Sequence, residues 1–192
     1  MVVSKEQIIQ WFILTYDLMK ENEEYLTELD SAIGDADHGK NMVRGFGRVK
    51  ERMSTVSEMD IGTILKTVSM TLMSTSGGAC GQLYANYFLR GGAAVAAKEE
   101  LDEQDLLELL QAGIEGVFQR GRALPGEKTI IDTFTPAAEA FKDAIDAQLS
   151  LADAISKCLE AAEKGVENTI GMKAKKGRAS YLGERSVGHQ DP

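Results

Sequence analysis

Hydrophobic residues along this chain recur every three or four positions, the spacing that gives a helix one buried face. Ser4 is followed three residues later by Gln7, a pattern typical of a helix N-terminus. A first helix is therefore predicted from Ser4 to about Leu29. Its buried face consists of Ile8, Ile9, Phe12, Ile13, Tyr16 and Met19.

Six more segments with helical spacing follow. They are predicted from about Asn41 to Met53, from Asp60 to near Ser74, from Leu83 to Ala97, from Asp102 to Gly121, from Thr135 onward and from Ser150 onward. Thr135 and Pro136 indicate a helix start, because proline favours the first helical position. Residues 122–133 are predicted to form a loop. Residues 173–192 are basic and glycine-rich and show no periodicity.

The strand-like alternation of apolar and polar residues nowhere lasts beyond a few positions, and the connections between amphipathic segments are short. Of the 192 residues, 43% are hydrophobic, 27% are charged and only 3 are proline, which is typical of a soluble helical protein. This length suits one domain with one core. The sequence therefore predicts a single all-α domain, residues 1–192, built as an up-and-down bundle.

The formal net charge of -9 argues against sequence-independent binding to nucleic acid, which relies on clustered lysine and arginine. No apolar run approaches the roughly 20 residues that span a bilayer, and the N-terminal residues lack the pattern of a signal peptide. We therefore expect a cytoplasmic protein with no nucleic acid and no membrane among its partners. Cys80 and Cys158 show no CxxC spacing, so neither a disulfide framework nor a zinc site is expected.

Residues 30–41, DSAIGDADHGKN, combine three carboxylates with two glycines. Oxygen-rich clusters bind hard cations, and magnesium is commonly held by a few carboxylates together with phosphate oxygens. Asp35 and Asp37 can face the same ions from an extended turn, with Asp30 reaching in from the end of the preceding helix. The EF-hand pattern is not met, so the segment favours magnesium over calcium.

His38, Gly39, Lys40 and Asn41 lie at the start of the next helix. Free amide groups and the positive end of the helix dipole favour a phosphate group at such a position. The alternative is that the aspartates only cap this helix, as aspartate often does. Both interpretations stay open, although three carboxylates beside a histidine favour a binding site.

Three further segments have two interpretations each. Residues 74–81, STSGGACG, place paired glycines before a helix, where amides can approach a phosphate or where two helices pack closely. Lys128 and Asp132 can form a polar pair beside a nucleotide or belong to a solvated turn. Arg178 and Arg185, near the C-terminus, suit contact with an anion or a solvated tail.

Taken together, GDADHGKNM, SGGACG, GEKTIID and GRASYLGERSVGHQDP closely resemble the motifs of the nucleotide-binding L subunits of bacterial dihydroxyacetone kinases. The motifs follow one another in order over essentially the whole chain, and the last is long and specific. The resemblance implies an up-and-down antiparallel barrel of about seven to eight amphipathic helices. Relatives continue beyond Pro192 into a final helix, so the last helix of the barrel is expected to be missing from this chain.

The resemblance also implies the cofactors and the residues of the site. ADP or ATP would be a tightly bound coenzyme with two Mg²⁺ ions per subunit, and Asp30, Asp35 and Asp37 match the metal ligands. The nucleotide contacts match His38, Gly39, Lys40, Asn41, Ala79, Cys80, Gly121, Ile130, Arg178, Asp191 and Pro192. No residue is assigned as a catalytic acid or base. Cys80 replaces the usual serine and Ile130 a frequent methionine, so a weaker donor and another apolar side chain stand there.

The stand-alone form of this family implies a particular division of work. A phosphohistidine-carrying M subunit of the phosphotransferase system phosphorylates the bound ADP in place, with phosphoenolpyruvate as the ultimate donor. The phosphoryl group then passes to dihydroxyacetone on a separate K subunit and gives dihydroxyacetone phosphate. Transfer of this kind requires chiefly alignment and charge neutralisation.

Other functions stay open at this point. The chain can instead be an ATP-exchanging subunit of an ATP-dependent dihydroxyacetone kinase, or a nucleotide-dependent protein that binds a regulator without turnover. The lack of a fused K-type domain in 192 residues favours the phosphoenolpyruvate-dependent subunit over the single-chain kinase. A purely structural helical bundle predicts no nucleotide binding.

Overall fold

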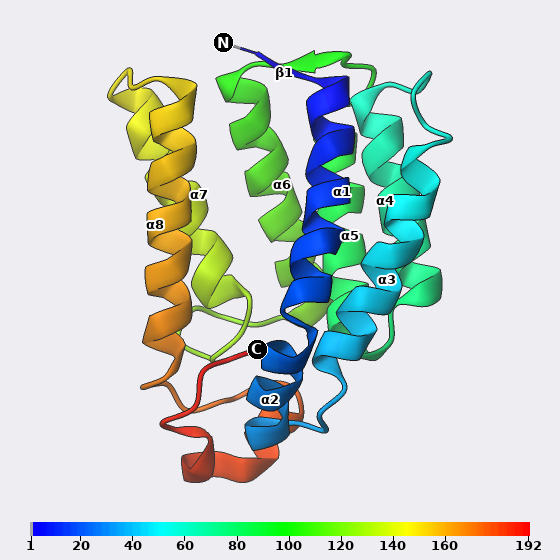
Figure 1. Ribbon diagram of the computed structural model, residues 1–192. Coiled ribbons are helices and arrows are strands. Elements are labelled where there is room, and N and C mark those ends of the chain that lie inside the picture. The colour runs from blue at the N-terminus through cyan, green and yellow to red at the C-terminus, as the bar shows by residue number, and fades with distance from the viewer. Residues whose placement is uncertain (1) are drawn as a thin grey trace.

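The computed structural model of the protein describes residues 2–192, and helices make up nearly all of its regular structure (Figure 1). The α-helices of these residues are α1 (Lys5–Glu21), α2 (Glu23–Ile33), α3 (His38–Met53), α4 (Ile61–Thr75), α5 (Gly78–Ala94), α6 (Glu103–Gly121), α7 (Ile131–Asp146) and α8 (Leu151–Thr169). Two short strands, β1 (Val3–Ser4) and β2 (Glu100–Leu101), pair antiparallel. A 3-10 helix, η1, covers Arg178–Ser186. The prediction of an all-α fold is confirmed.

The helices run up and down between two ends of the molecule (Figure 1). Four of them, α1, α4, α6 and α8, begin at the end that carries β1 and β2, which we call the ribbon end. The helices α3, α5 and α7 begin at the opposite end, which α2 also reaches by continuing the direction of α1. Residues 170–192 follow α8, contain η1 and lie across this opposite end. We call these residues the strap, and this end the strap end.

Most helices pack chiefly against a neighbour in the sequence, most closely α4 on α5, α5 on α6 and α7 on α8. α1 packs on α3, whereas α8 makes few contacts with α1, so in residues 2–192 the ring of helices is open between them. Both helices also carry exposed apolar side chains, Trp11, Leu14 and Leu18 on α1 and Ile155 and Leu159 on α8.

None of the helices described here combines the length and the apolar character that a membrane span requires.

The main hydrophobic core joins α1, α3, α4, α5 and α6. Of the predicted first face, Ile8 and Phe12 are buried in it, and the ring of Phe12 meets that of Phe88 edge to face with centroids 5.2 Å apart. A smaller cluster joins α6, α7 and α8 and consists of Leu107, Phe141, Ala144, Leu151 and Ala154. The helical spacing of apolar residues therefore identified the buried faces correctly.

The first predicted helix is in fact two helices, separated at Asn22. The backbone amide of Asn22 donates to the carbonyl of Leu18 at 3.1 Å, and its side-chain amide donates to the same oxygen at 2.9 Å. Asn22 itself leaves the helical conformation, with φ -100° and ψ 15°. Because its side chain satisfies the last turn of α1, the helix ends there, and the predicted unbroken helix to Leu29 is wrong.

Three helices also begin earlier than predicted: α3 at His38 rather than Asn41, α5 at Gly78 rather than Leu83, and α7 at Ile131 rather than Thr135. Pro136 therefore lies inside α7 rather than at its start. The preceding loop explains this start, because the Asp132 carboxylate accepts hydrogen bonds from the amides of Gly126 at 2.5 Å and Thr129 at 2.8 Å. These bonds shape the turn from which α7 begins, five residues before the proline.

Candidate functional site

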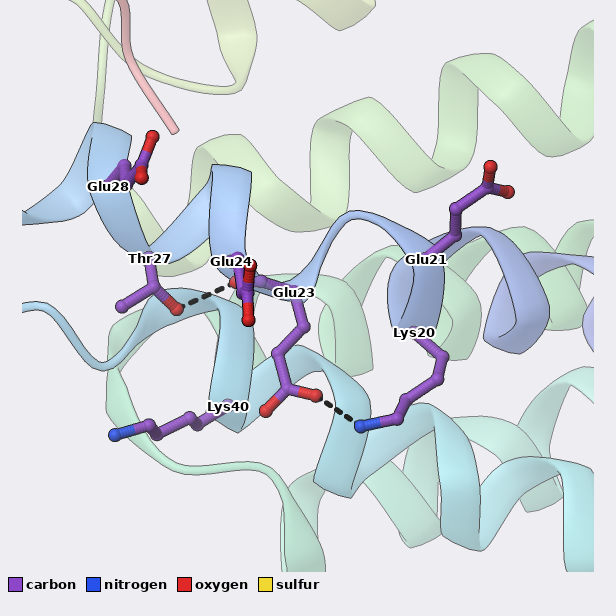
Figure 2. A pocket seen from close by; sticks show the side chains of 7 residues that line it. All are labelled: Lys20, Glu21, Glu23, Glu24, Thr27, Glu28 and Lys40. Carbon is purple, nitrogen blue, oxygen red and sulfur yellow. Dashed lines mark hydrogen bonds and ion pairs between the residues drawn. The ribbon is translucent and has the colours of Figure 1, made fainter.

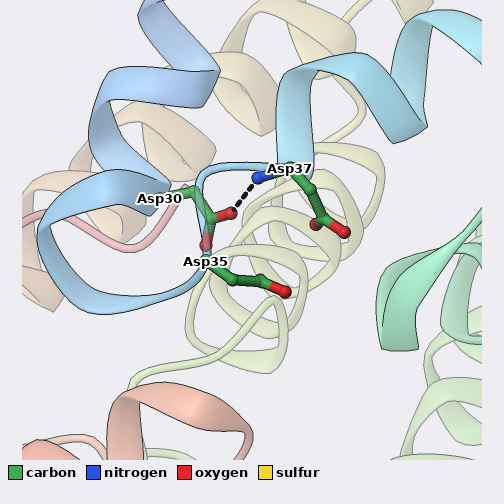
Figure 3. A group of neighbouring side chains, drawn as sticks. All are labelled: Asp30, Asp35 and Asp37. Carbon is green, nitrogen blue, oxygen red and sulfur yellow. Dashed lines mark hydrogen bonds between the residues drawn. The ribbon is translucent and has the colours of Figure 1, made fainter.

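Three carboxylates meet at the strap end. Asp30 lies in the last turns of α2 and is buried, whereas Asp35 and Asp37 lie in the turn between α2 and α3. One ligand oxygen from each lies within 4.8 Å of the other two, and Figure 3 shows the three side chains close together around the turn between α2 and α3. Ala36, between the two exposed aspartates, has φ 60°, a left-handed conformation that reverses the chain here.

The buried Asp30 organises this turn. Its Oδ2 accepts hydrogen bonds from the amides of Asp37 at 2.8 Å and His38 at 3.1 Å. Gly34 approaches the same carboxylate so closely that a Cβ at position 34 would overlap with Asp30 Oδ1. One oxygen of Asp30 therefore holds the start of α3, and the other remains for a cation. The capping and metal-binding interpretations of this aspartate are compatible.

The strap reaches this cluster through Arg178. A guanidinium nitrogen of Arg178, at the start of η1, lies 3.0 Å from a carboxylate oxygen of Asp35. Residues of η1 also contact α2. A positive side chain from the strap is thus placed beside the predicted metal ligands, where a phosphate group would need it.

At the strap end, the residue directly before each helix does not cap it with its side chain, although Asp30 accepts from the His38 amide and the Thr129 hydroxyl from the Ile131 amide. Asp37, Gly77 and Ile130 precede α3, α5 and α7, and none of them accepts a side-chain hydrogen bond from the first turn of its helix. Amides in a first helical turn have no partner within the helix and together with the helix dipole attract anions. The aspartate cluster therefore lies at an end that favours phosphate oxygens.

The starts of α3 and α5 are joined by polar contacts that local sequence patterns do not indicate. Arg44 donates to Asn41 Oδ1 at 2.6 Å and to the carbonyl of Thr75 at 2.9 Å. The hydroxyl of Ser76 donates to the carbonyl of Asn41 at 3.2 Å. These bonds hold the glycine-rich turn before α5 beside the start of α3. Arg44 could not be identified from local sequence because its partner Thr75 is distant along the chain.

Cys80 and Asp191 belong to the same neighbourhood as the cluster. Burial raises the pKa of the Cys80 thiol to about 12, and the charges of Asp191, Asp30 and Asp37 raise it further. This thiol stays protonated at neutral pH and is a weak hydrogen-bond donor. Burial also raises the pKa of Asp191 to about 7, with the Lys128 ammonium acting in the opposite direction.

His38 and Gly39 have distinct roles at the start of α3. Burial lowers the pKa of the His38 ring, although Asp30 and Asp37 act against this shift. Gly39 is buried where α3 passes α2, and a Cβ there would come within 2.6 Å of the Thr27 hydroxyl. The glycine therefore allows the close approach of the two helices that brings His38 to the cluster.

Lys40 faces a different surface. It lines a hollow of about 700 Å³ beside α1, α2 and α3, together with Lys20, Glu21, Glu23, Glu24, Thr27 and Glu28 (Figure 2). Lys20 pairs with Glu23 at 2.5 Å in this hollow, and the Thr27 hydroxyl donates to the carbonyl of Glu23 at 2.7 Å. None of the three clustered aspartates lines it. Of the four residues predicted at the start of α3, Lys40 is the one directed to this surface.

The remaining predicted contacts come from other elements that meet at the strap end. Ala79 lies in the first turn of α5, and Gly121 ends α6. Ile130 precedes α7 and packs, partly buried, on the main core. Pro192 ends the strap. The fold thus brings distant parts of the sequence to one end of the molecule.

Lys128 and Asp132 have separate partners rather than forming the polar pair considered above. Asp132 accepts hydrogen bonds from amides of its own loop. Lys128 donates to backbone carbonyls at the end of α8 and in the strap. Backbone carbonyls are present at every residue, so a lysine that binds them leaves no pattern in the sequence.

The donor set fits a hard divalent cation. Carboxylate oxygens that converge in a turn, next to space for phosphate oxygens, are what Mg²⁺ prefers in proteins. The negative charge of Asp30, Asp35 and Asp37 is opposed in the structure by the guanidinium of Arg178, which contacts Asp35. Together with the start of α5, which has no side-chain cap, this arrangement can hold a phosphate compound with its magnesium.

Comparison with known proteins gives a consistent family. The family model described as the DAK2 domain matches residues 32–192. The chain is 44% identical over 192 residues to the "PEP-dependent dihydroxyacetone kinase, ADP-binding subunit DhaL" of Escherichia coli strain K12, covering 100% of this chain and 91% of that protein. It is 39% identical, with the same coverage, to the "PEP-dependent dihydroxyacetone kinase 1, ADP-binding subunit DhaL" of Listeria innocua.

Solved structures of the dihydroxyacetone kinase of C. freundii share the fold. The native form matches with a TM-score of 0.70 at 20% identity, over 98% of this chain and 32% of that one. The form in complex with AMP-PNP and Mg²⁺ matches with a TM-score of 0.71 at 19% identity, over 97% and 32%. The present chain therefore corresponds to about a third of that kinase chain. From the matched residues and the full-length relatives, this chain belongs to the DAK2 domain family.

Proposed function

We propose that this chain is the ADP-binding subunit of a phosphoenolpyruvate-dependent dihydroxyacetone kinase and works in the cytoplasm. The observation that carries the proposal is the convergence of Asp30, Asp35 and Asp37 beside the starts of α3 and α5, whose own cap residues make no side-chain hydrogen bond to the first turn. The relatives that match this chain over its full length are named as such subunits. These names favour the phosphoenolpyruvate-dependent function over an ATP-dependent kinase.

In this function the chain binds and orients a nucleotide rather than supplying an acid or a base. Asp30, Asp35 and Asp37 hold magnesium, for which we propose two ions per subunit. When bound, these ions neutralise phosphate charge and align the group that is transferred. The amides at the starts of α3 and α5 bind phosphate oxygens, and Arg178 is placed to contact them from the strap.

The partners follow from the position of the site. A K-type subunit that holds dihydroxyacetone and an M-type phosphohistidine donor must each approach the nucleotide, so we propose that both dock in turn at the strap end. Arg178 and Arg185 lie in the strap. Replacement of either arginine is expected to slow at least one of the two transfer steps, measured separately with each purified partner. Unchanged rates for both steps in both variants would rule out this docking face.

The first experiment asks what the purified protein contains. The protein is denatured, the released nucleotide is identified by mass spectrometry, and the metal is quantified. We expect one ADP and about two magnesium ions per chain. An empty protein that exchanges ATP reversibly would instead support the ATP-dependent subunit, and a protein that binds neither nucleotide would overturn the proposal.

A transfer assay separates the kinase subunit from a nucleotide-dependent regulator. Dihydroxyacetone, the K-type subunit and the phosphorylated donor are combined with this chain, and dihydroxyacetone phosphate is measured. The proposed function requires product that depends on this chain. A protein that only senses the nucleotide would bind ADP but give no product.

A further inference from the structure

Lys128 is almost fully buried, with 2% of its surface exposed, and it carries a charge into the protein. Its Nζ donates to the carbonyls of Thr169 and Ser186 at 2.8 Å each, to that of Met172 at 3.3 Å, and also to that of His189. Thr169 ends α8, and the other three carbonyls belong to the strap. One ammonium group therefore connects the loop before α7, the end of α8 and two separate parts of the strap.

The loop before α7 is built to place this side chain. Lys128 has φ 61°, a conformation that residues other than glycine rarely adopt. The bonds from Gly126 and Thr129 to the Asp132 carboxylate hold the residues on both sides of it. The carbonyl of Glu127 accepts a hydrogen bond from the amide of Lys175 in the strap at 3.1 Å. Polar contacts thus maintain an unfavourable backbone conformation at Lys128, and in this conformation its side chain points towards the strap.

The strap has little apolar attachment of its own beyond the buried side chain of Ala174. Neither of the two hydrophobic clusters described above contains a residue from 170–192. Its other contacts are largely polar. The amide of Gly188 donates to the carbonyl of Ile170 at 2.8 Å, and the amide of Asp191 donates to the Thr169 hydroxyl at 3.0 Å. Removal of the Lys128 ammonium would take a donor from the buried contacts with the carbonyls of Thr169 and Ser186 and from the part-buried contacts with Met172 and His189. Loss of a donor from a buried carbonyl is costly.

We infer that Lys128 is a positioning residue, which holds the strap across the strap end so that Arg178 and Asp191 lie beside the clustered aspartates. One part of this inference rests on the proposed function: that the strap forms part of the nucleotide site. Arg178, which contacts Asp35 at 3.0 Å, is the part of the strap closest to the proposed metal ligands. Burial lowers the pKa of Lys128 while Asp191 opposes the shift, and hydrogen bonds to carbonyls favour the charged form.

The test compares Lys128→Met with the wild type. Methionine keeps much of the length and apolar volume of lysine but removes the ammonium group. Hydrogen exchange of the amides of residues 170–192 is measured in the nucleotide-free protein, and ADP affinity is measured with Mg²⁺ present. We expect strap amides to exchange at least about tenfold faster and ADP to bind at least about tenfold more weakly.

Two further variants separate positioning from general destabilisation. Leu151→Ala removes a buried side chain at the other end of α8, and it is expected to lower stability without changing strap exchange or ADP affinity. Lys128→Arg keeps the charge, but the planar donors of arginine cannot converge on four carbonyls. The exchange rate of the strap amides and the ADP affinity of this variant should therefore lie between those of the wild type and of Lys128→Met. If Lys128→Met does not fold, Lys128→Arg provides the same comparison.

The outcomes are distinct. If the strap amides of the Lys128 variants exchange hydrogen at the wild-type rate, the inference is overturned. It is also overturned if these amides exchange faster but the ADP affinity is unchanged. If the wild-type protein itself binds no ADP, the proposed function fails instead. Hydrogen exchange of the strap amides in the nucleotide-free protein then still decides whether Lys128 holds the strap.

Discussion

The two ends of the barrel begin their helices in different ways. At the ribbon end, Ser4, Asp60, Asp102 and Ser150 each accept a hydrogen bond from the first turn of the helix that follows. At the strap end, the cap residues of α3, α5 and α7 accept none. The cap residues of the ribbon end therefore satisfy amides of their own helices and add stability. At the strap end, Asp30 binds the amide of His38 and Thr129 that of Ile131, whereas the start of α5 and the clustered carboxylates are left for a ligand. Substitutions at the two ends should consequently affect different properties.

The largest effect is expected from Asp35→Asn at the strap end. The amide keeps the size of the side chain but removes a negative ligand oxygen, so we expect Mg²⁺-dependent ADP affinity to fall by about 100-fold or more. Asp35 is exposed and makes an ion pair with Arg178, so the free energy of unfolding should change by no more than about 0.5 kcal/mol. Calorimetric titration with ADP and Mg²⁺ measures the ADP affinity, and urea unfolding measures the free energy of unfolding.

The matched control for this prediction is Asp17→Asn. Asp17 is a carboxylate of α1 that pairs with Lys50 at 2.6 Å and lies outside the cluster. Its replacement should leave ADP affinity unchanged. Equal affinities for wild type and Asp35→Asn would show that the cluster binds no functional cation.

A second prediction concerns the turn that places the carboxylates. In Gly34→Ala the new methyl group would overlap with Asp30 Oδ1, so the carboxylate must move away from the position that holds the amides of Asp37 and His38. We expect a loss of about 2 kcal/mol in urea unfolding together with weaker magnesium binding. Gly171→Ala is the control, because a Cβ there meets nothing within 4 Å. Equal stability of the two variants would contradict the close approach of Gly34 to Asp30.

The third prediction uses the opposite pKa shifts of two carboxylates. The hydrogen bond from Thr63 lowers the pKa of Asp60 at the ribbon end, whereas burial raises that of Asp191 at the strap end to about 7. An aspartate in the unfolded chain has a pKa of about 3.9. Between about pH 4 and pH 7, folded Asp191 thus keeps a proton that the unfolded chain has lost. Its contribution to stability is present below about pH 4 and decreases as the pH rises through 7.

Urea unfolding at several pH values, without metal or nucleotide, measures this contribution. Asp191→Asn cannot ionise, so its free energy of unfolding should decrease less than that of the wild type between pH 4 and pH 7, by up to about 3 kcal/mol. Identical pH dependence in the two proteins would show that Asp191 is solvated like an ordinary surface carboxylate. Asp60 acts in the opposite direction, because its stabilising charge is lost only as the pH falls below about 4.

The same difference between the ends explains what could be predicted from the sequence. The capping box of Ser4 and Gln7 and the helix that it starts depend on residues three apart, and they were predicted correctly. The aspartates of the strap end were also found, because all three lie in one short segment. The contacts of Arg44 with Thr75 and of Lys128 with Ser186 join residues far apart in the sequence. Such contacts depend on how whole helices pack, which periodicity alone does not determine.

The smallest effect is expected at the ribbon end, from Asp60→Ala. The Asp60 carboxylate accepts hydrogen bonds from the amides of Thr63 at 3.1 Å and Ala97 at 3.0 Å, so it both caps α4 and holds the chain after α5. We expect a loss of about 1 kcal/mol, or a decrease of about 2 to 4 °C in Tm, with unchanged ADP affinity. Asp60→Asn retains an acceptor and should lose less. A change in ADP affinity for Asp60→Ala would show that the two ends are coupled, because a cap at one end would then influence a site at the other.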